Sequence, residues 1–544
     1  IGHHERLIEG RRMNQAEAKR RQAEAFSDIL MFVTIYVLGG LTGDNGITYT
    51  AVAVQACTLF WIMISGSLSD ALGKLLRARK NKGQYRNIAR MRGSAMLFVL
   101  VLGLAGSLVL AALSGVVADK LFRIPYSRLI LLAMSPVVAL RSVSSVLEGY
   151  FQGEGAELPR AIAGILRQVF LLGFGILFCH LVGGYGDKVS SLLRQENFSA
   201  MYGGLGIALA VSLSELLVVL LLGLIYKGSR RFERKAKQEG MYATDSHWDC
   251  ARYLYSARWP QCLTGLCAFL PFVLGLVFVG RKGEAGGQMA VEYGLYVGKY
   301  LVACGIGTAA LTILIMPIIA RIFQCFKREE NRFARTVFQC GVHFGLVHGI
   351  FLTVFVAVLG EQIVDLLHPV NEQMVAEMLQ RGSALILLAP LCVYFARILH
   401  SMGKRYLVLA AVCGTDVLFV MTVLLSMGKA GILSLVYGGL AGAGLLCALL
   451  GVLAYRQMRV RPDWLGVFAV PLGAGGVAGL MILLIRKAFS AHLGSLAILI
   501  TAFLAAGLVY WIMLLLLRNF KEQELEAVPG GNLISKLGQL LKVF

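Results

Sequence analysis

The sequence contains few charged residues for its length. Asp, Glu, Lys and Arg make up 15% of its 544 residues, whereas a soluble domain averages about 25%. Apolar runs of about 18 or more residues recur along the whole chain, as membrane-spanning helices require, and the mean hydropathy is +0.71. The composition therefore predicts an all-α polytopic membrane protein and argues against a soluble globular domain.

Several chemical signatures are also missing. The eleven cysteines are scattered without a CxxC pair, which argues against a disulfide framework or a zinc site. The glycine-rich runs lack the lysine of a phosphate-binding loop, and no loop carries a nucleophile elbow or a paired-acid motif. We therefore expect no enzymatic activity, no catalytic residue, no metal, no cofactor and no ATPase domain. No cleavable signal peptide is visible.

The apolar segments predict about fourteen membrane-spanning helices. Residues 1–25 before them predict a cytoplasmic surface helix, and residues 518–544 after them predict an amphipathic cytoplasmic tail. The segments lie near 26–43, 47–71, 94–117, 128–150, 160–183, 203–226, 254–279, 289–320, 334–360, 376–401, 406–427, 431–455, 465–486 and 493–517.

The net charge of +21 is concentrated in alternate connections between these segments, above all in 72–93 and 227–252. Cytoplasmic loops of membrane proteins carry such an excess of Lys and Arg. The pattern predicts a multi-pass protein of the inner (plasma) membrane with both termini in the cytoplasm. The basic loops are expected to meet anionic lipid headgroups, and we expect no nucleic-acid partner.

A weak internal repeat suggests how the segments are grouped. Residues 85–93 resemble residues 333–341, and each stretch follows a basic loop and opens a helix. The repeat predicts an N-lobe of six helices (26–226), a basic linker (227–252), a C-lobe of six helices (253–455) and two further helices (456–517). Internal repeats of this kind are typical of transporters whose binding site lies between the halves.

Few ionisable residues occur within the apolar segments, where a charge costs at least about 2.5–3.5 kcal/mol. They are Arg141, Glu148, Arg167, Glu215, Arg258, Glu292, Lys299, His343, His348, Arg397, His400 and Asp416. Cations outnumber acids near the predicted midplane, which suits an anionic cargo because a desolvated cation pairs closely with phosphate.

We predict that Lys299, Arg141, Arg258 and Arg397 bind the substrate, with Lys299 as the leading candidate. The alternative for Lys299 is a side chain that reaches the outer headgroups, and the alternative for Arg397 is headgroup contact at the cytoplasmic end. These four residues have in common a positive charge within or beside an apolar run.

The remaining charges have other predicted roles. Glu148 and Arg167 are expected to form a structural ion pair between two consecutive helices, with cargo binding as the alternative. Asp416 and Glu215 are candidate sites for a coupling ion, Na⁺ or H⁺. His343 lies among glycines at small-residue spacing, which favours helix packing.

One stretch carries a resemblance to a known family. Residues 147–153, Leu-Glu-Gly-Tyr-Phe-Gln-Gly, are followed by Pro159 and by Arg167-Gln168. This pattern resembles the junction of helices four and five in the multidrug/oligosaccharidyl-lipid/polysaccharide (MOP) exporter superfamily. It is most similar to the branch that holds polysaccharide exporters, stage V sporulation protein B-like proteins and the lipid II flippase MurJ. Members of the family commonly have Arg at the position of Glu148 in this chain, and Glu at the position of Arg167.

The resemblance covers roughly residues 26–517 and implies a V-shaped pair of six-helix lobes, two further helices that form a lipid-side groove, and alternating access. Lys299 falls near a cavity arginine of lipid II flippases. Those flippases also carry arginines in helices one and two, and segments 26–43 and 47–69 here have none.

The resemblance thus implies a flippase that moves an undecaprenyl-diphosphate-linked saccharide from the inner to the outer leaflet, with membrane lipids as its surroundings and a monomeric state. The rival interpretations are a cation-coupled multidrug exporter, which would favour acids in its cavity, and a membrane glycan ligase. The ligase would need a catalytic group in an outer loop, where His368 is the candidate. A non-transporting scaffold would need no charges at midplane.

Overall fold

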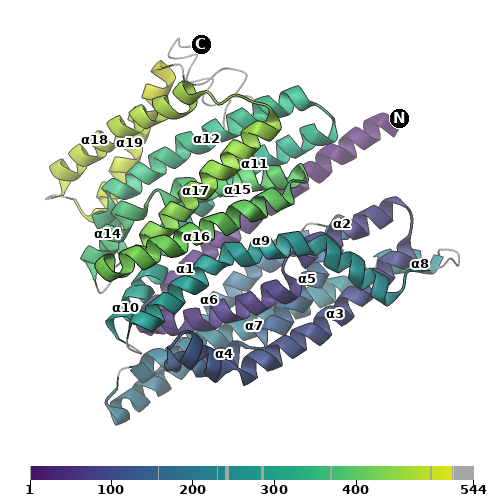
Figure 1. Cartoon of the computed structure of the whole chain (residues 1–544), viewed down its shortest axis with the longest axis horizontal. Coiled ribbons are helices and arrows are strands. Elements are labelled where there is room, and N and C mark those ends of the chain that lie inside the picture. Colours follow the sequence, from purple (N-terminus) through teal and green to yellow (C-terminus); the bar gives the residue numbers. More distant parts are fainter. Residues whose placement is uncertain are drawn as a thin grey trace. The chain divides into compact units, whose positions relative to one another are not determined.

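The computed structural model describes residues 2–517 and 519, apart from 157, 196, 230, 239–243, 284–286, 368–370 and 491–492. Throughout these residues the chain is helical and forms no strand, as the sequence predicts. Its contacts define two compact units, Ile1–Gly298 (unit 1) and Lys299–Phe544 (unit 2). The helices are labelled in Figure 1.

Unit 1 holds ten α-helices and two short helical turns among its described residues. They are α1 (Gly2–Ser65), α2 (Leu68–Asn81), α3 (Tyr85–Ala112), η1 (Val116–Leu121), η2 (Pro125–Ser127), α4 (Arg128–Met134), α5 (Val137–Glu154), α6 (Leu158–Leu193), α7 (Asn197–Ser229), α8 (Arg231–Gln238), α9 (His247–Lys282) and α10 (Gln288–Leu295).

Unit 2 follows from the turn η3, which begins at the end of unit 1. Its described elements are η3 (Tyr296–Tyr300), α11 (Leu301–Lys327), α12 (Asn331–Val358), α13 (Gly360–Leu367), α14 (Glu372–Gly382), α15 (Leu385–Ser401), α16 (Arg405–Ala430), α17 (Leu433–Met458), η4 (Leu465–Ala469), α18 (Val470–Phe489) and α19 (Ser495–Leu516). Within this unit α16 lies along α17, and α18 lies along α19 (Figure 1).

The described residues contain eleven helices long and apolar enough to cross a membrane, or up to thirteen when each of two bent helix pairs counts as one span. The longest, Gln22–Asn81, includes most of α1. The backbone of α1 is broken at Gly43, where φ is 73° and ψ is 169°. Glycine is the residue that adopts such a positive φ without steric cost.

The chain folds back at Gly43. Thr42 and Thr50 lie on either side of the break, and they lie against two consecutive glycines of α7, Gly203 and Gly204. Eight residues of straight helix would separate the two threonines by about 12 Å. The two parts of α1 are therefore the separate segments 26–43 and 47–71 of the prediction. With this division and both bent pairs, the described residues supply the predicted fourteen spans.

The ends of the chain differ from the prediction in one respect. Residues 2–25 are helical, but α1 runs from Gly2 through the first apolar segment without a break before Gly43. They are thus the beginning of a longer helix rather than a separate surface helix. The predicted amphipathic tail, apart from residue 519, lies outside the described residues.

The Gly-Tyr-Phe-Gln-Gly stretch at 149–153 lets α2 approach α5 closely. A Cβ atom on Gly149 would lie 2.9 Å from the backbone oxygen of Ser69, and one on Gly153 would lie 2.6 Å from Leu76. Between the two glycines, the backbone carbonyl of Gln152 accepts a hydrogen bond from Arg77 of α2 at 2.8 Å. The stretch that carries the family resemblance is therefore the docking surface for α2.

Substitution of Gly149 by alanine is expected to lower the free energy of unfolding by about 1–3 kcal/mol, because the added methyl group meets backbone atoms that cannot rotate away. Gly173 of α6 is a matched control, since nothing lies within 4 Å of its added Cβ. Gly173→Ala should be neutral or stabilising by up to about 1 kcal/mol. Thermal unfolding in detergent measures both variants, and equal midpoints would contradict this account of the α2–α5 contact.

Helices α9 and α10 belong to unit 1, although the repeat predicts a second lobe that begins at residue 253. Two hydrogen bonds join α1 to α10, the helix that follows α9 in the chain. Gln55 Nε2 donates to the hydroxyl of Tyr293 at 2.8 Å, and Thr48 Oγ1 donates to the carbonyl of Ala290 at 2.6 Å. All of these groups are buried, so each bond satisfies a polar atom that would otherwise be costly at this depth.

The last two helices pack against α12 within unit 2. The hydroxyl of Tyr510 in α19 donates to the carbonyl of Val347 at 2.7 Å. A Cβ on Gly475 of α18 would lie 2.7 Å from Ile350, which shows how closely α18 approaches α12. Small residues at such contacts let membrane helices pack tightly. The role of α18 and α19 as a lipid-side groove stays a prediction.

Candidate functional site

A buried carboxylate in the middle of α7 holds two arginines of unit 1. The side chain of Glu215 is 2% exposed, and its Oε1 lies 2.8 Å from Nε of Arg167 in α6 and 3.9 Å from Nε of Arg141 in α5. Arg167 Nη2 also donates to Oε1 of Glu148 at 3.3 Å. The structure thus brings together the predicted pair, Glu148 and Arg167, and joins it to two further predicted residues.

A third arginine extends this arrangement toward the end of the bundle. Arg160 of α6 lies 3.9 Å from Glu148, 3.1 Å from Asp70 of α2 and 3.4 Å from Glu24 of α1. It also donates a hydrogen bond to the side-chain oxygen of Gln152 at 2.9 Å. One guanidinium therefore connects α1, α2 and α5 to α6. We refer to the seven charged residues together as the ion-pair chain: Glu24, Asp70, Arg141, Glu148, Arg160, Arg167 and Glu215.

Alternation of charge explains why these residues are tolerated within apolar helices. An unpaired buried ion costs several kcal/mol, and a partner with further hydrogen bonds offsets much of that cost. Between its two ends the chain alternates arginine and glutamate, so each buried carboxylate has two guanidinium neighbours. Such a network positions five helical segments of unit 1 relative to one another.

Arg141 is the open end of the ion-pair chain. Its side chain is 38% exposed although the residue lies well inside a membrane-spanning segment. Its guanidinium lies over the ring of Trp61 at 4.5 Å, and its contact with Glu215 is long at 3.9 Å. A charge at that depth faces water or a partner rather than lipid tails. Arg141 is therefore the member of the ion-pair chain that we consider as a contact for an anionic ligand.

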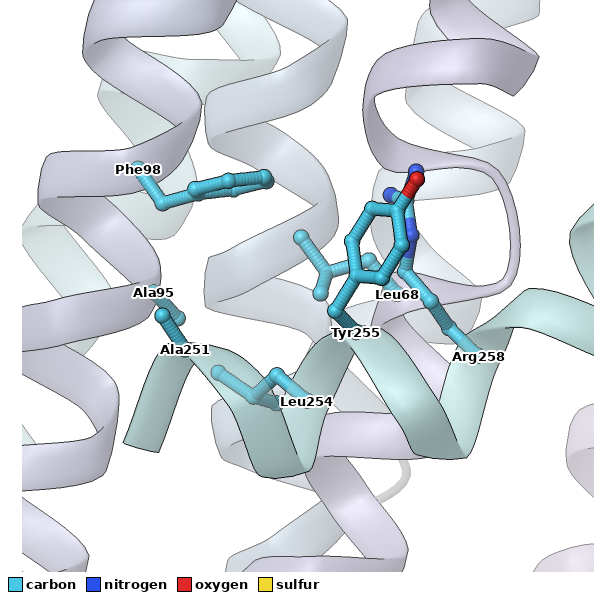
Figure 2. A pocket seen from close by; sticks show the side chains of 7 residues that line it. All are labelled: Leu68, Ala95, Phe98, Ala251, Leu254, Tyr255 and Arg258. Carbon is cyan, nitrogen blue, oxygen red and sulfur yellow. The ribbon is translucent and has the colours of Figure 1, made fainter. Parts of the chain in front are cut away.

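Arg258 has a different environment from the one that the sequence suggests. It is 2% exposed, and its two terminal nitrogens donate to the carbonyls of Met63 and Ile64 in the last turn of α1. Basic groups commonly satisfy the free carbonyls at a helix C-terminus. Figure 2 shows Arg258 beside Tyr255 at a small pocket that is otherwise apolar. The prediction that it binds substrate gains no support from this geometry.

The other two predicted substrate cations lie in unit 2. Lys299 is 7% exposed and donates to the carbonyl of Leu367, at the C-terminus of α13, at 3.1 Å. Arg397 of α15 is half-buried. Each unit therefore holds two of the four predicted cations. The role of Lys299 and Arg397 in substrate binding stays a prediction.

The predicted acids and histidines fall in different surroundings. Asp416 of α16 is 8% exposed, within the described part of unit 2. Glu292 of α10 accepts a hydrogen bond from Gln288 at 3.0 Å. His343 is buried and pairs with the side chain of Asn519 at 2.8 Å, and His400 contacts the carbonyl of its own helix four residues earlier. His368 lies outside the described residues.

Sequence reasoning did not identify Arg160 as part of the site. Arg160 follows Pro159 at the very start of an apolar segment, where a basic residue is commonly a headgroup contact. Asp70 could have indicated this role, because it is an acid at the polar end of the second predicted segment, 47–71. An acid and a base at the same end of two neighbouring spans are candidates for pairing.

Comparison with solved structures identifies the fold. The chain matches an inward-facing multidrug resistance MATE family transporter of the MOP superfamily with a TM-score of 0.59 and 12% identity, over 81% of this chain and 98% of that one. It matches the eukaryotic MATE transporter AtDTX14 with a TM-score of 0.59 and 15% identity, over 83% and 98%. It also matches a MOP superfamily transporter from Pyrococcus furiosus with a TM-score of 0.58 and 10% identity, over 82% and 95%.

The sequence itself points to the same superfamily. A stretch of 141 residues is 27% identical to stage V sporulation protein B of Bacillus subtilis, which is 26% of this chain and 27% of that protein's length. No family model matches. The fold is that of MOP superfamily transporters, and with the sequence match it supports the predicted membership of the MOP exporter superfamily. The matched structures are transporters rather than enzymes.

Proposed function

We propose that the chain moves a lipid-linked saccharide with an anionic diphosphate headgroup across the membrane by alternating access. Arg141 carries the proposal, because it is a partly exposed guanidinium within a membrane-spanning segment that makes only a loose ionic contact. An arginine binds phosphate oxygens with two parallel hydrogen bonds, which a neutral or cationic cargo would not accept. The ring of Trp61, over which it lies, orients the guanidinium plane for such a contact.

The ion-pair chain supplies the support for Arg141. Because Arg167 holds Glu215 at 2.8 Å, the carboxylate is already neutralised and competes weakly for Arg141 at 3.9 Å. A phosphate that binds Arg141 therefore has to replace only this weak contact with Glu215. The same pairing holds Glu215 in place between two guanidinium groups, so we assign it a structural role rather than that of a coupling-ion site.

An anionic cargo is compatible with the range of pockets that this fold holds. One structural neighbour is described as a MOP superfamily transporter whose binding pocket has reverse polarity and suggests a different function, so the fold accommodates pockets of more than one charge.

The driving force follows from the charge of the cargo. We place both termini in the cytoplasm because the basic loops lie on the side of the N-terminus. With that orientation a membrane potential that is negative inside favours outward movement of an anion by about 2.3 kcal/mol per charge for each 100 mV. We propose that the prenyl tail stays in lipid beside α18 and α19 while the headgroup crosses.

A leaflet assay in proteoliposomes tests the proposal. A fluorescent prenyl-diphosphate saccharide is placed in the liposomes, and membrane-impermeant dithionite bleaches only the outer leaflet. We expect the full chain to expose the inner pool at least about tenfold faster than protein-free liposomes, and an uncharged glycolipid with the same tail to stay protected. Protection that is the same with and without protein would remove the proposal.

Multidrug export is the second candidate. The buried carboxylate of Asp416 is a candidate proton or Na⁺ site, and several solved structures with this fold are multidrug transporters. Efflux of a cationic dye under a pH gradient, lost in Asp416→Asn, would favour this candidate. The leaflet assay and the dye assay on the same preparation decide between the two.

A further inference from the structure

Two basic helices lie at the end of unit 1 where the ion-pair chain finishes. The helix α2 begins three residues after α1 ends, and α8 follows α7 after one residue, so both lie directly at the ends of membrane spans. Their exposed basic side chains, with one from α3, define a surface that we call the basic platform. It consists of Lys74, Lys80, Lys82, Arg90, Arg234, Lys235 and Lys237.

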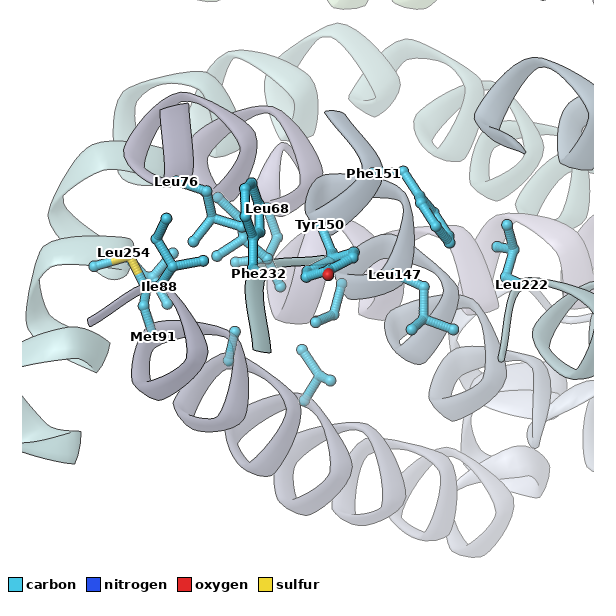
Figure 3. Packing of buried hydrophobic residues seen from close by; sticks show 14 of the residues in the cluster. Leu68, Leu76, Ile88, Met91, Leu147, Tyr150, Phe151, Leu222, Phe232 and Leu254 are labelled. Atoms are coloured by element: carbon cyan, nitrogen blue, oxygen red, sulfur yellow. The ribbon is translucent and has the colours of Figure 1, made fainter. Parts of the chain in front are cut away.

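The helix α8 packs against unit 1 through the aromatic side chain of Phe232, and Lys235 lies over the ring of Tyr85 at 5.1 Å. Phe232 is 2% exposed, and its ring lies 5.5 Å from that of Tyr150 in α5 and 6.2 Å from that of Tyr85 in α3. Tyr226 of α7 completes the group at 5.0 Å from Tyr150. Figure 3 shows Phe232 and Tyr150 within the same apolar cluster. Aromatic pairs at these distances add to the energy of burial.

The segment before α9 is attached to the same surface. The carboxylate of Asp245 lies 2.5 Å from Arg79 of α2, and its backbone N–H donates to the side chain of Asn87 in α3 at 3.1 Å. Two residues later, His247 hydrogen-bonds Ser94 of α3 at 2.7 Å. Residues predicted as a basic linker are therefore packed on α2 and α3 on both sides of 239–243.

The basic face of α2 is left exposed because the apolar face is already used. Leu68, Leu72 and Leu76 are fully buried against unit 1, so they cannot enter a bilayer as the apolar face of a surface helix does. The outward face carries Lys74 and Lys80. Basic clusters that directly adjoin membrane spans attract anionic headgroups. This cluster lies at the ends of two spans, where lipid headgroups are within its reach.

We propose that the basic platform binds anionic phospholipid headgroups of the leaflet at this end of unit 1. Each lysine or arginine attracts a lipid phosphate, and α2, α3 and α8 are packed against unit 1, so the helices that carry the cations are fixed before the lipid arrives. Pre-organisation of this kind lowers the entropy lost on binding. Charge complementarity and the adjoining spans favour lipid over an acidic protein as the occupant.

Photo-crosslinking in nanodiscs tests the proposal on the full chain. Photoactivatable phosphatidylglycerol and phosphatidylcholine are compared in the same bilayer, and labelled peptides are mapped by mass spectrometry. We expect phosphatidylglycerol to label residues 68–92 and 231–247 at least about tenfold more than phosphatidylcholine. The preference should shrink in 0.5 M salt, because the Debye length falls to about 4 Å.

A charge-removal variant and a matched control complete the experiment. Lys74→Gln, Lys82→Gln, Arg234→Gln and Lys237→Gln together should abolish the preference. The control Arg328→Gln, Arg332→Gln, Lys404→Gln and Arg405→Gln removes four charges from unit 2 and should retain it, with a similar melting temperature. A preference that survives in the platform variant would overturn the proposal, as would equal labelling by both lipids, which would favour an acidic protein partner. Neither outcome depends on transport.

Discussion

Arg141→Ala is expected to slow transfer of a diphosphate-linked lipid by about 10- to 150-fold. A hydrogen bond to a charged group contributes about 1.5–3 kcal/mol, and each 1.4 kcal/mol corresponds to a factor of ten. The loss should appear with the anionic cargo alone, since an uncharged glycolipid offers the guanidinium no phosphate oxygen to bind. Initial rates in the dithionite assay measure the effect.

Two controls accompany this variant. Arg141→Lys keeps the charge without the planar fork of donors and should recover part of the rate. Lys188→Ala removes an exposed cation of α6 outside the ion-pair chain and should transport as the unchanged protein does. Melting temperatures close to that of the unchanged protein separate a transport defect from unfolding. A full rate in Arg141→Ala would assign cargo binding elsewhere.

Glu215→Ala is expected to be the most destabilising single substitution in the ion-pair chain. Removal of one partner from a buried pair leaves an uncompensated charge and costs about 3–5 kcal/mol. Here the side chain of Glu215 is 2% exposed and serves both Arg167 and Arg141. The free energy of unfolding in detergent, from thermal or SDS titration, measures the loss.

The double variant Arg167→Met/Glu215→Leu tests whether the loss comes from charge. Replacement of a buried ion pair by apolar residues of similar volume is often neutral or stabilising, so the double variant should be clearly more stable than Glu215→Ala. Equal losses in the two variants would mean that packing, rather than an unpaired arginine, sets the cost.

The membrane spans were predictable because each is a long apolar run with a local signature. The points at which one helix ends and the next begins were less predictable. The turn at Gly43 was predicted as a gap between two segments, but most of α2 was predicted as part of the basic connection 72–93, and only its first residues were placed in the second span. The helix was missed although Leu68, Leu72 and Leu76 recur at helical spacing. Their spacing is that of a helix with one apolar face, and sequence does not state whether that face meets lipid or α5.

The pair Glu148–Arg167 was predictable because opposite charges occupied neighbouring helices at positions where the family has the reverse order. The role of Arg258 was not predictable, because its partners are backbone carbonyls of α1 about 195 residues away. Every residue has a backbone carbonyl, so the sequence does not indicate which of them accepts a hydrogen bond. Lys299 likewise donates to a carbonyl. A cation in an apolar run has two possible uses, ligand binding and helix capping, and the distinction depends on tertiary contacts.

The bonds that tie α9 and α10 to α1 have a consequence for how the polypeptide could be divided. A cut between α8 and α9 follows the sequence repeat, yet it would strip unit 1 of two of its helices and leave Gln55 and Thr48 without their partners in lipid. The upstream fragment made alone should be degraded. Co-expression with the downstream fragment should rescue it, because the two would reassemble across the severed loop.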